Sequence, residues 1–206
     1  RQRDDLLAAA RDWQAAGAWD RLHQVLLDRL GQADRIDWDR AAADLAAVPA
    51  PPGGANTGPN PPDRGKPGTK RHVVVDANGI PLAARPPAAN VHDCTMLVEI
   101  IAAIQPFGGL HEDSAAADEQ HADKGYYGVC LEDRRRRGII PWIARRGTER
   151  RDRHGLHRWV VKRTLAWFHQ FRRLYVRYER RDDVHQAFLT LGASLICWNF
   201  LQWESC

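Results

Sequence analysis

The sequence has few cysteines, and none of them are spaced as a metal site requires. The chain holds four thiols, and no two form a Cys-x-x-Cys pair; they are Cys94, Cys130, Cys197 and Cys206. A disulfide-stapled secreted domain has a denser framework, and a structural zinc site needs closely spaced cysteine or histidine pairs. The cysteines therefore predict reduced thiols in a cytosolic protein.

The sequence also lacks a long apolar run and an N-terminal leader. No apolar run approaches the roughly 20 residues that a membrane span requires. Residues 1–14 contain no hydrophobic core of a signal peptide. These absences favour a cytoplasmic protein with no membrane partner. The chain starts inside a helical pattern, which suggests a truncated N-terminus, and its 206 residues suffice for one domain with a small appendage.

Positive charge is concentrated in one part of the chain, although the net charge is only +4. Residues 134–181 contain 17 Lys and Arg against three acidic residues, a net charge of +14, which leaves −10 for the remainder. Such asymmetry is typical of proteins that bind a polyanion, and nucleic acid is the first candidate. The alternative is a solvated helix rich in arginine.

The N-terminal part of the chain is predicted to be helical. Apolar residues recur at three- and four-residue spacings up to Leu30, and Gly17 is expected to divide this region into two helices. Residues 32–48 are ambiguous, because their alanines favour a helix while the following sequence favours a sheet. Residues 49–68 are so rich in proline and glycine that we predict an excursion without regular structure. We divide the chain into a helical segment, 1–37, and a second domain, 38–206.

The second domain reads as alternating strands and helices. Two apolar runs, 72–75 and 80–84, flank the turn sequence Asp-Ala-Asn-Gly and predict a β-hairpin. A helix with Asp93 near its N-cap follows, and then a strand end, a helix that ends at Gly138, and another short strand. A long basic helix over residues 156–179 and a largely buried helix close the chain. This order predicts an α/β fold, a mixed sheet flanked by helices.

Two aspartates and one face of the basic helix are the candidate functional residues. Asp44 is the only ionisable residue between positions 41 and 47. Asp123 follows a strand end, where an α/β sheet commonly binds a ligand or metal, although turn capping is the alternative explanation. On the helix, Arg158 and Lys162 fall on the arc opposite the apolar residues. That face either meets a ligand or meets only water.

Several stretches, in order and at sensible spacing, carry a resemblance to a known family. They are WQAAGAWDRLHQVLLDRL, NTGPNPPDRGKPGTKRHVVVDANGIPLA, ANVHD, ADKGYY, GIIPWIARRGTE and the segment that begins HRWVVKRTLAWFHQFRRL. Together they resemble bacterial insertion-sequence transposases of the DDE class, the IS five group, from about residue 8 to residue 200. The resemblance implies an RNase H-like mixed sheet flanked by helices. It also implies metal-dependent DNA cleavage and strand transfer at the ends of a mobile element.

The resemblance further implies which residues form the DDE site. The family's first aspartate falls on Asp44 and its second, in Ala-Asp-Arg-Gly-Tyr, falls on Asp123, which makes both expected ligands of two Mg²⁺ (or Mn²⁺) ions. The third acid is the glutamate of His-Arg-Trp-Val-Val-Glu-Arg-Thr, and Lys162 occupies that position here. Lysine removes an oxygen ligand and adds a cation where two dications must gather. We therefore predict weakened metal binding and impaired cleavage.

DNA is the partner that both the charge and the resemblance imply. The expected substrate is double-stranded DNA, at the element's terminal inverted repeats and at the target, bound by a cytoplasmic, nucleoid-associated protein that could form a homodimer. The residues expected to contact DNA are Arg158, Lys162, Arg163, Arg172 and Arg173. Glu149 and Glu179 are conceivable substitutes for the third acid, but Glu179 would lie roughly 25 Å from Lys162 along a helix. The competing interpretation is a transposase-derived DNA-binding protein without catalytic activity.

Overall fold

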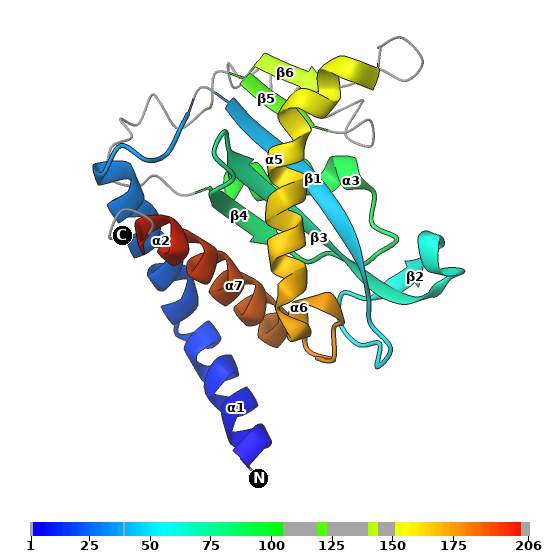
Figure 1. The fold of residues 1–206 in the computed structure, drawn as a ribbon. Coiled ribbons are helices and arrows are strands. Elements are labelled where there is room, and N and C mark those ends of the chain that lie inside the picture. Colours follow the sequence, from blue (N-terminus) through cyan, green and yellow to red (C-terminus); the bar gives the residue numbers. More distant parts are fainter. Residues whose placement is uncertain (1, 39, 105–118, 123–139, 144–150, 203–206) are drawn as a thin grey trace.

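A computed structural model describes residues 2–38, 40–104, 119–122, 140–143 and 151–202. Within these residues a six-stranded sheet lies among helices (Figure 1). The sheet mixes antiparallel and parallel pairs, and its two faces belong to two separate clusters of buried residues. The predicted α/β class, a mixed sheet flanked by helices, is confirmed.

The strand order matches the RNase H-like expectation. The central strand β1 (Arg40–Pro49) pairs antiparallel with β3 (Lys66–Asp76), which pairs antiparallel with β4 (Pro81–Arg85). On its other side β1 pairs parallel with β5 (Glu119–Ala122), and β5 pairs parallel with β6 (Ile140–Ile143). Residues 40–49, whose alanines left helix and strand equally open, are therefore a strand hydrogen-bonded along both edges.

Two helices precede the sheet, as predicted. They are α1 (Gln2–Ala15) and α2 (Ala18–Gln32), and Gly17 between them has a φ of 66°. Glycine adopts this left-handed conformation without steric cost, which explains why the helix breaks there. Both helices pack against α7 (Asp182–Gln202), the last helix of the chain. Figure 1 shows this helical layer beside the sheet.

Side chains of β1 alternate between two parts of the core, as strand geometry requires. Ala41 and Ala43 pack with residues of α2 and of α3 (Asp93–Ala102). Ala42 packs on the opposite face with residues of α5 (Arg151–Gln170) and of α7. Figure 1 shows α5 lying across β1 on this second face. The face of β1 that carries the even-numbered residues is therefore the one covered by α5.

The hairpin between β3 and β4 forms where it was predicted. Asp76, fully buried, accepts hydrogen bonds from the backbone N–H groups of Asn78 at 3.0 Å and Ile80 at 2.7 Å. It also accepts one from Asp37 at 3.0 Å, which ties the turn to the segment before β1. Burial raises the pKa of Asp76 to about 7, against the opposing effect of these hydrogen bonds.

The proline- and glycine-rich region contains more regular structure than predicted. A short strand, β2 (Gly58–Asn60), pairs with the start of β3, and a 3-10 turn covers Pro61–Asp63. The pairing of β1 with β3 extends to Pro49 opposite Gly68. A Cβ at Gly68 would lie 2.8 Å from the Cβ of Asn60, so a glycine is needed for β2 to approach. The expectation of an irregular excursion over 49–68 was wrong at these positions.

The long basic helix is shorter than the predicted 156–179. α5 ends at Gln170, and one further turn, α6 (Arg172–Tyr175), follows Phe171, whose ψ is 113°. Beyond α6 the backbone N–H of Arg177 donates to the carbonyl of Pro49 at 2.9 Å. The chain therefore leaves the helix to bind the end of β1.

The side chain of Arg177 explains why this extended segment is stable. Arg177 is fully buried, and its guanidinium donates to the carbonyls of Ala55 at 2.6 Å, Asn56 at 3.1 Å and Glu179 at 2.8 Å. A buried charge is tolerated only when its donors are satisfied in this way. Two of these carbonyls, those of Ala55 and Asn56, are distant in the sequence, so they hold residues 176–179 in an extended path away from the predicted helix.

Among the described residues, α7 alone is long and apolar enough to cross a membrane by length and composition. The sequence analysis found no such run. Within the fold, 56% of its most apolar window is buried against the rest of the protein. Its buried residues include Leu189, Ala193 and Cys197, which belong to the two core clusters. The apolar composition of α7 is thus accounted for by core packing.

Candidate active site

Asp44 lies near the middle of β1, on the face of the sheet that α5 covers. Its side-chain neighbours along the strand, Ala42 and Ala46, pack with Val161 and Leu165 of α5. Asp44 is only 6% exposed, and its Oδ1 accepts the backbone N–H of Leu45 at 2.9 Å. Alternation places Asp44 on the same face as its two alanine neighbours. The strand therefore holds one buried carboxylate beneath α5.

The strand that leads to Asp123 lies directly beside Asp44. β5 pairs with β1 in parallel, and the last Cα partners of this ladder are Ala43 and Ala122. In the sequence, Ala43 and Ala122 are each followed by an aspartate, at positions 44 and 123. Asp123 itself lies outside the described residues, so its side chain is not part of the described site. The structure nevertheless places Ala122, the residue before Asp123, beside Ala43, the residue before Asp44.

Lys162 lies on α5, on the same side of the sheet as Asp44, but its side chain is exposed. The preceding residue, Val161, is fully buried and packs in the cluster that contains Ala42. The helix is thereby seated on β1 through its valines, while the lysine points toward solvent beside the contact. The sequence prediction that Lys162 occupies a polar face of the helix is confirmed.

The residues in this place fit a divalent metal only in part. Asp44 supplies the hard carboxylate oxygen that Mg²⁺ or Mn²⁺ prefers, and Asp123 is chemically of the same kind. A protonated lysine has no lone pair to offer, so position 162 cannot supply a third ligand. Over the described part of the chain, no three His, Cys, Asp or Glu side chains lie close enough together to hold an ion.

Arg163, predicted to contact DNA, is engaged inside the protein. Its Nη2 donates to the carbonyl of Asn78 at 2.5 Å, in the turn between β3 and β4. Its guanidinium lies over the rings of Trp159 and Trp167, with centroid distances of 4.6 Å and 4.8 Å. The next residue, Thr164, donates to the carbonyl of Gly79 at 2.7 Å. These contacts fasten α5 to the hairpin and give Arg163 a structural role.

The remaining basic residues differ in their surroundings. Arg173 pairs with the carboxylate of Glu179 and lies over Phe188, with 5.1 Å between the guanidinium carbon and the ring centroid. Arg172 is exposed. Arg158 belongs to α5, but its side chain lies outside the described residues. Of the predicted DNA contacts with a described side chain, Lys162 and Arg172 present their charge to solvent.

Neither glutamate considered as a substitute for the third acid is described at the site. Glu179 is 6% exposed and is held by Arg173, with His185 Nδ1 3.8 Å from its Oε2. Burial alone would raise the pKa of Glu179, but the nearby His185 and the paired Arg173 lower it. This carboxylate is therefore committed to its own cluster beyond α6. Glu149 lies outside the described residues.

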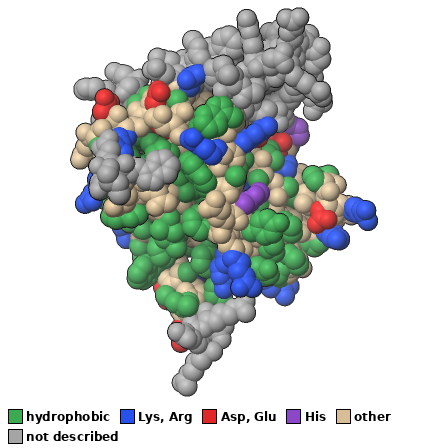
Figure 2. Space-filling model, in the orientation of Figure 1, with side chains coloured by type: hydrophobic (Ala, Val, Ile, Leu, Met, Phe, Trp, Pro, Cys, Tyr) green, Lys and Arg blue, Asp and Glu red, His purple; other side chains and the backbone are tan. Residues whose placement is uncertain are grey.

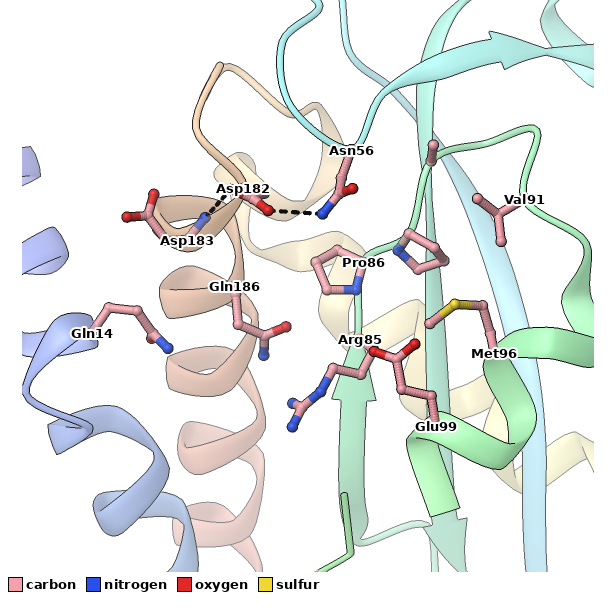
Figure 3. Close-up of a pocket in the computed structure, with 12 residues that line it drawn as sticks. Gln14, Asn56, Arg85, Pro86, Val91, Met96, Glu99, Asp182, Asp183 and Gln186 are labelled. Atoms are coloured by element: carbon pink, nitrogen blue, oxygen red, sulfur yellow. Dashed lines mark hydrogen bonds between the residues drawn. The ribbon is translucent and has the colours of Figure 1, made fainter. Parts of the chain in front are cut away.

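A cavity of about 380 Å³ lies elsewhere, between the start of α7 and the segment that joins β4 to α3 (Figure 3). Its lining carries three acids, Glu99, Asp182 and Asp183, against one basic residue, Arg85. Asp182 is already bonded by Asn56 Nδ2 at 2.8 Å, as Figure 3 shows. A negative lining disfavours a phosphate backbone. The candidate site for DNA chemistry is accordingly the β1–β5–α5 region and not this cavity.

Comparison with known proteins agrees with this arrangement. Residues 42–200 match the family model described as "Transposase DDE domain". The chain belongs to the DDE transposase family. It is 52% identical over 155 residues to a Burkholderia cepacia protein named as a transposase for insertion sequence element IS402, covering 73% of this chain and 72% of that protein. It is also 54% identical over 52 residues to an IS402 protein of 16.2 kDa from the same organism. That match covers 25% of this chain and 35% of the 16.2 kDa protein.

Membership of the DDE transposase family confirms several expectations from the sequence. The matched region contains Asp44, Asp123 and Lys162. The mixed sheet agrees with the RNase H-like fold of DDE transposases, and the family activity is DNA cleavage and strand transfer with a divalent metal. DNA is therefore the substrate class. Trp159 and Arg177 were not among the predicted functional residues; Trp159, one turn before Arg163 on α5, could have been found by its spacing.

Proposed function

We propose that this insertion-sequence transposase binds the terminal inverted repeats of its element, with Asp44 and Asp123 as metal ligands. We further propose that Lys162, in place of the third acid, impairs its cleavage activity. The pairing of Ala43 with Ala122 carries the proposal. Each of these paired residues, on adjacent parallel strands, is followed in the sequence by one of the two aspartates. Adjacent strands in a sheet are about 4.8 Å apart, which suits two carboxylates that share metal ions.

The surroundings of Asp44 support its assignment as a ligand. A carboxylate that is 6% exposed on a strand paired at both edges has little freedom to move. A carboxylate held in this way offers the hard oxygen that Mg²⁺ or Mn²⁺ prefers. In the family the divalent ions, when bound, activate water and stabilise the leaving oxygen of the phosphodiester. Asp44 would hold and orient that site.

Lys162 changes the balance of charge at this place. An acid-to-lysine exchange alters the local charge by about two units and removes one oxygen ligand. Its exposed ammonium is instead suited to a DNA phosphate, as a point charge on a flexible stem. We infer tight, salt-dependent DNA binding with weak or absent cleavage in Mg²⁺ or Mn²⁺. Two metal ions, target DNA, a homodimer and association with the nucleoid belong to the same proposal.

A second candidate function is DNA binding without any catalysis. The presence of a cation at position 162 favours it, because a site short of one acid can keep its electrostatic grip on DNA and lose the metal. The two candidates differ in a single measurement, which is nicking by the protein at saturating metal concentration. A residual metal-dependent rate supports the impaired enzyme, and no rate supports the binding protein.

Lys162→Glu is the variant that tests the site assignment. We expect it to generate Mg²⁺-dependent nicking of DNA that carries the element ends, and an added Asp123→Ala to abolish that nicking. Lys162→Gln is the matched control, because it removes the positive charge without restoring an acid. If Lys162→Glu and Lys162→Gln behave alike, the third acid does not belong at this position and the proposed site is wrong.

A further inference from the structure

The outward face of α5 carries a stripe of exposed side chains, of which only Lys162 belongs to the proposed metal site. Its members step along the helix by three or four residues, with His169 and Gln170 both one turn after the third member, and so share one side of the helix. They are Trp159, Lys162, Ala166, His169 and Gln170, all of them exposed. Figure 2 shows hydrophobic, basic and histidine side chains interspersed over this side of the molecule. We call these five residues the α5 stripe.

The stripe continues onto α6 through an aromatic contact. The rings of His169 and Tyr175 meet edge to face, with centroids 5.8 Å apart, and Tyr175 is 61% exposed. Partial burial, and to a smaller degree the charge of Arg71, lowers the pKa of His169. The lowered pKa favours the neutral imidazole, and Lys162 lies between Trp159 at one end and the His169–Tyr175 pair at the other.

Trp159 is held in place although half of its surface is exposed. It is 51% exposed, and the guanidinium of Arg163 lies over its ring. Arg163 is in turn fixed by the carbonyl of Asn78 and by Trp167, whose ring meets that of Phe200 at a centroid distance of 5.9 Å. A large aromatic ring, braced behind and open in front, is a preformed platform for another planar group.

The neighbours of Trp159 indicate which planar group fits. Large contiguous apolar patches mark many protein-docking surfaces, whereas the α5 stripe with Tyr175 places aromatic rings beside a lysine, a histidine and an amide. Aromatic rings interleaved with basic side chains are the pattern of surfaces that bind single-stranded nucleic acid, where bases stack on rings and cations meet phosphates. Trp159 and Lys162 are separated by about 4.5 Å along the helix axis.

We propose that the α5 stripe binds an unpaired DNA strand, with one base stacked on Trp159 and the adjacent phosphate on Lys162. The proposal rests on the proposed function, since it names the form in which DNA passes the candidate site. Val160 and Val161, between these two residues, pack α5 onto the face of the sheet that carries Asp44. A strand on the stripe would therefore run past the site. Stacking tolerates any base, so we expect little sequence preference.

Fluorescence anisotropy of a labelled 12-nucleotide thymidine strand and of a duplex of equal length tests the proposal, in EDTA so that cleavage does not interfere. We expect Trp159→Ala to weaken single-strand binding about tenfold, and Trp159→Phe to retain most of it. Trp159→Leu keeps apolar bulk under Arg163 but has no ring, so it should bind as weakly as Trp159→Ala. Trp198→Ala, at a tryptophan 44% exposed on α7, is the matched control and should bind normally.

Three results would overturn the α5 stripe. The first is single-strand affinity unchanged in both Trp159→Ala and Trp159→Leu, with each variant folded by its thermal melt. The second is equal weakening for a normal strand and for a strand with abasic positions, because stacking needs bases. The third is that the Trp159 variants lose a self-association that the unmodified protein shows in sedimentation, which would make Trp159 a contact between protein copies. Whichever of these results is found, the proposed function survives if the unmodified protein binds duplex DNA with a steep salt dependence. If the unmodified protein binds no DNA, the proposed function and the α5 stripe proposal both fail.

Discussion

Ala43 and Ala122 are Cα partners at the end of the parallel ladder between β1 and β5. Each immediately precedes an aspartate in the sequence. Two acidic positions that are 79 residues apart in the chain therefore come directly after residues that are paired in the sheet. The helix that covers this face carries Lys162, which we propose stands at the position of the family's glutamate. This relationship connects the family pattern to the fold, and the predictions below separate the residues that serve the site from those that hold the scaffold.

Asp44→Asn should abolish the nicking that Lys162→Glu restores. The amide is isosteric but neutral and ligates Mg²⁺ poorly, so we expect a loss of about 100-fold or more in rate at unchanged thermal stability. Relaxation of supercoiled plasmid in Mg²⁺ measures the rate. Asp63→Asn, on the exposed 3-10 turn, is the control and should keep full activity. Equal rates for the two variants would remove Asp44 from the site.

Arg163 and Arg172 should differ in what they do when replaced by alanine. Arg163→Ala loses the hydrogen bond to Asn78 and two ring contacts, so we expect about 1–3 kcal/mol of lost stability and an unchanged salt dependence of DNA binding. Arg172→Ala should leave stability unchanged and reduce the slope of log K against log salt by about 1. Denaturant melts and binding titrations at several salt concentrations check both. The reverse result would mean that Arg163 contacts DNA directly.

Arg177→Ala should be strongly destabilising. The substitution removes the guanidinium that binds the carbonyls of Ala55 and Asn56 and leaves a cavity where a fully buried side chain was, so we expect a loss of about 3–5 kcal/mol. Urea unfolding measures it. Arg180→Ala is the matched control, since that side chain is exposed and its substitution should change stability by less than about 0.5 kcal/mol. Similar effects for both would show that the 176–181 segment is not anchored by Arg177.

Asp76 should make stability fall as the pH rises from about 4 to about 7. Burial raises its pKa from 3.8 to about 7, so within this window the folded state holds a proton that the unfolded chain has released. The protonation-linked stability is complete below the unfolded pKa and is lost as the pH approaches the folded one. Its size is on the order of 4 kcal/mol. Urea melts across this pH range measure the trend.

Asp76→Asn isolates this contribution from that of the buried histidines. Burial lowers the pKa of His72 to about 4, so its effect has the opposite sign and reduces stability as the pH falls below 6.5. The difference between the unmodified protein and Asp76→Asn should therefore retain only the Asp76 slope. A difference that does not vary between pH 4 and pH 7 would show that Asp76 stays ionised throughout.

Much of the local structure followed from patterns a few residues long. The Gly17 break, the hairpin around Asn78 and the helix at Asp93 were each signalled by residues within one or two turns of each other. The assignment of Lys162 to the third acidic position also came from a short motif that resembles the family pattern, and it stays a prediction. Backbone propensity and turn chemistry act over such short distances, so the sequence alone reports them well.

The sequence by itself determined the fold class and the family, and it predicted that Lys162 stands at the third acidic position. Only the tertiary structure decided that residues 40–49 form a strand, because β3 and β5 bond to both of its edges. Only the tertiary structure ended α5 at Gln170, because Arg177 binds carbonyls more than 120 residues earlier in the chain. It also showed that Lys162 is exposed whereas Arg163 is bound to Asn78 and to two tryptophan rings within the protein. Such outcomes depend on partners brought together by folding, and no short-range pattern encodes them.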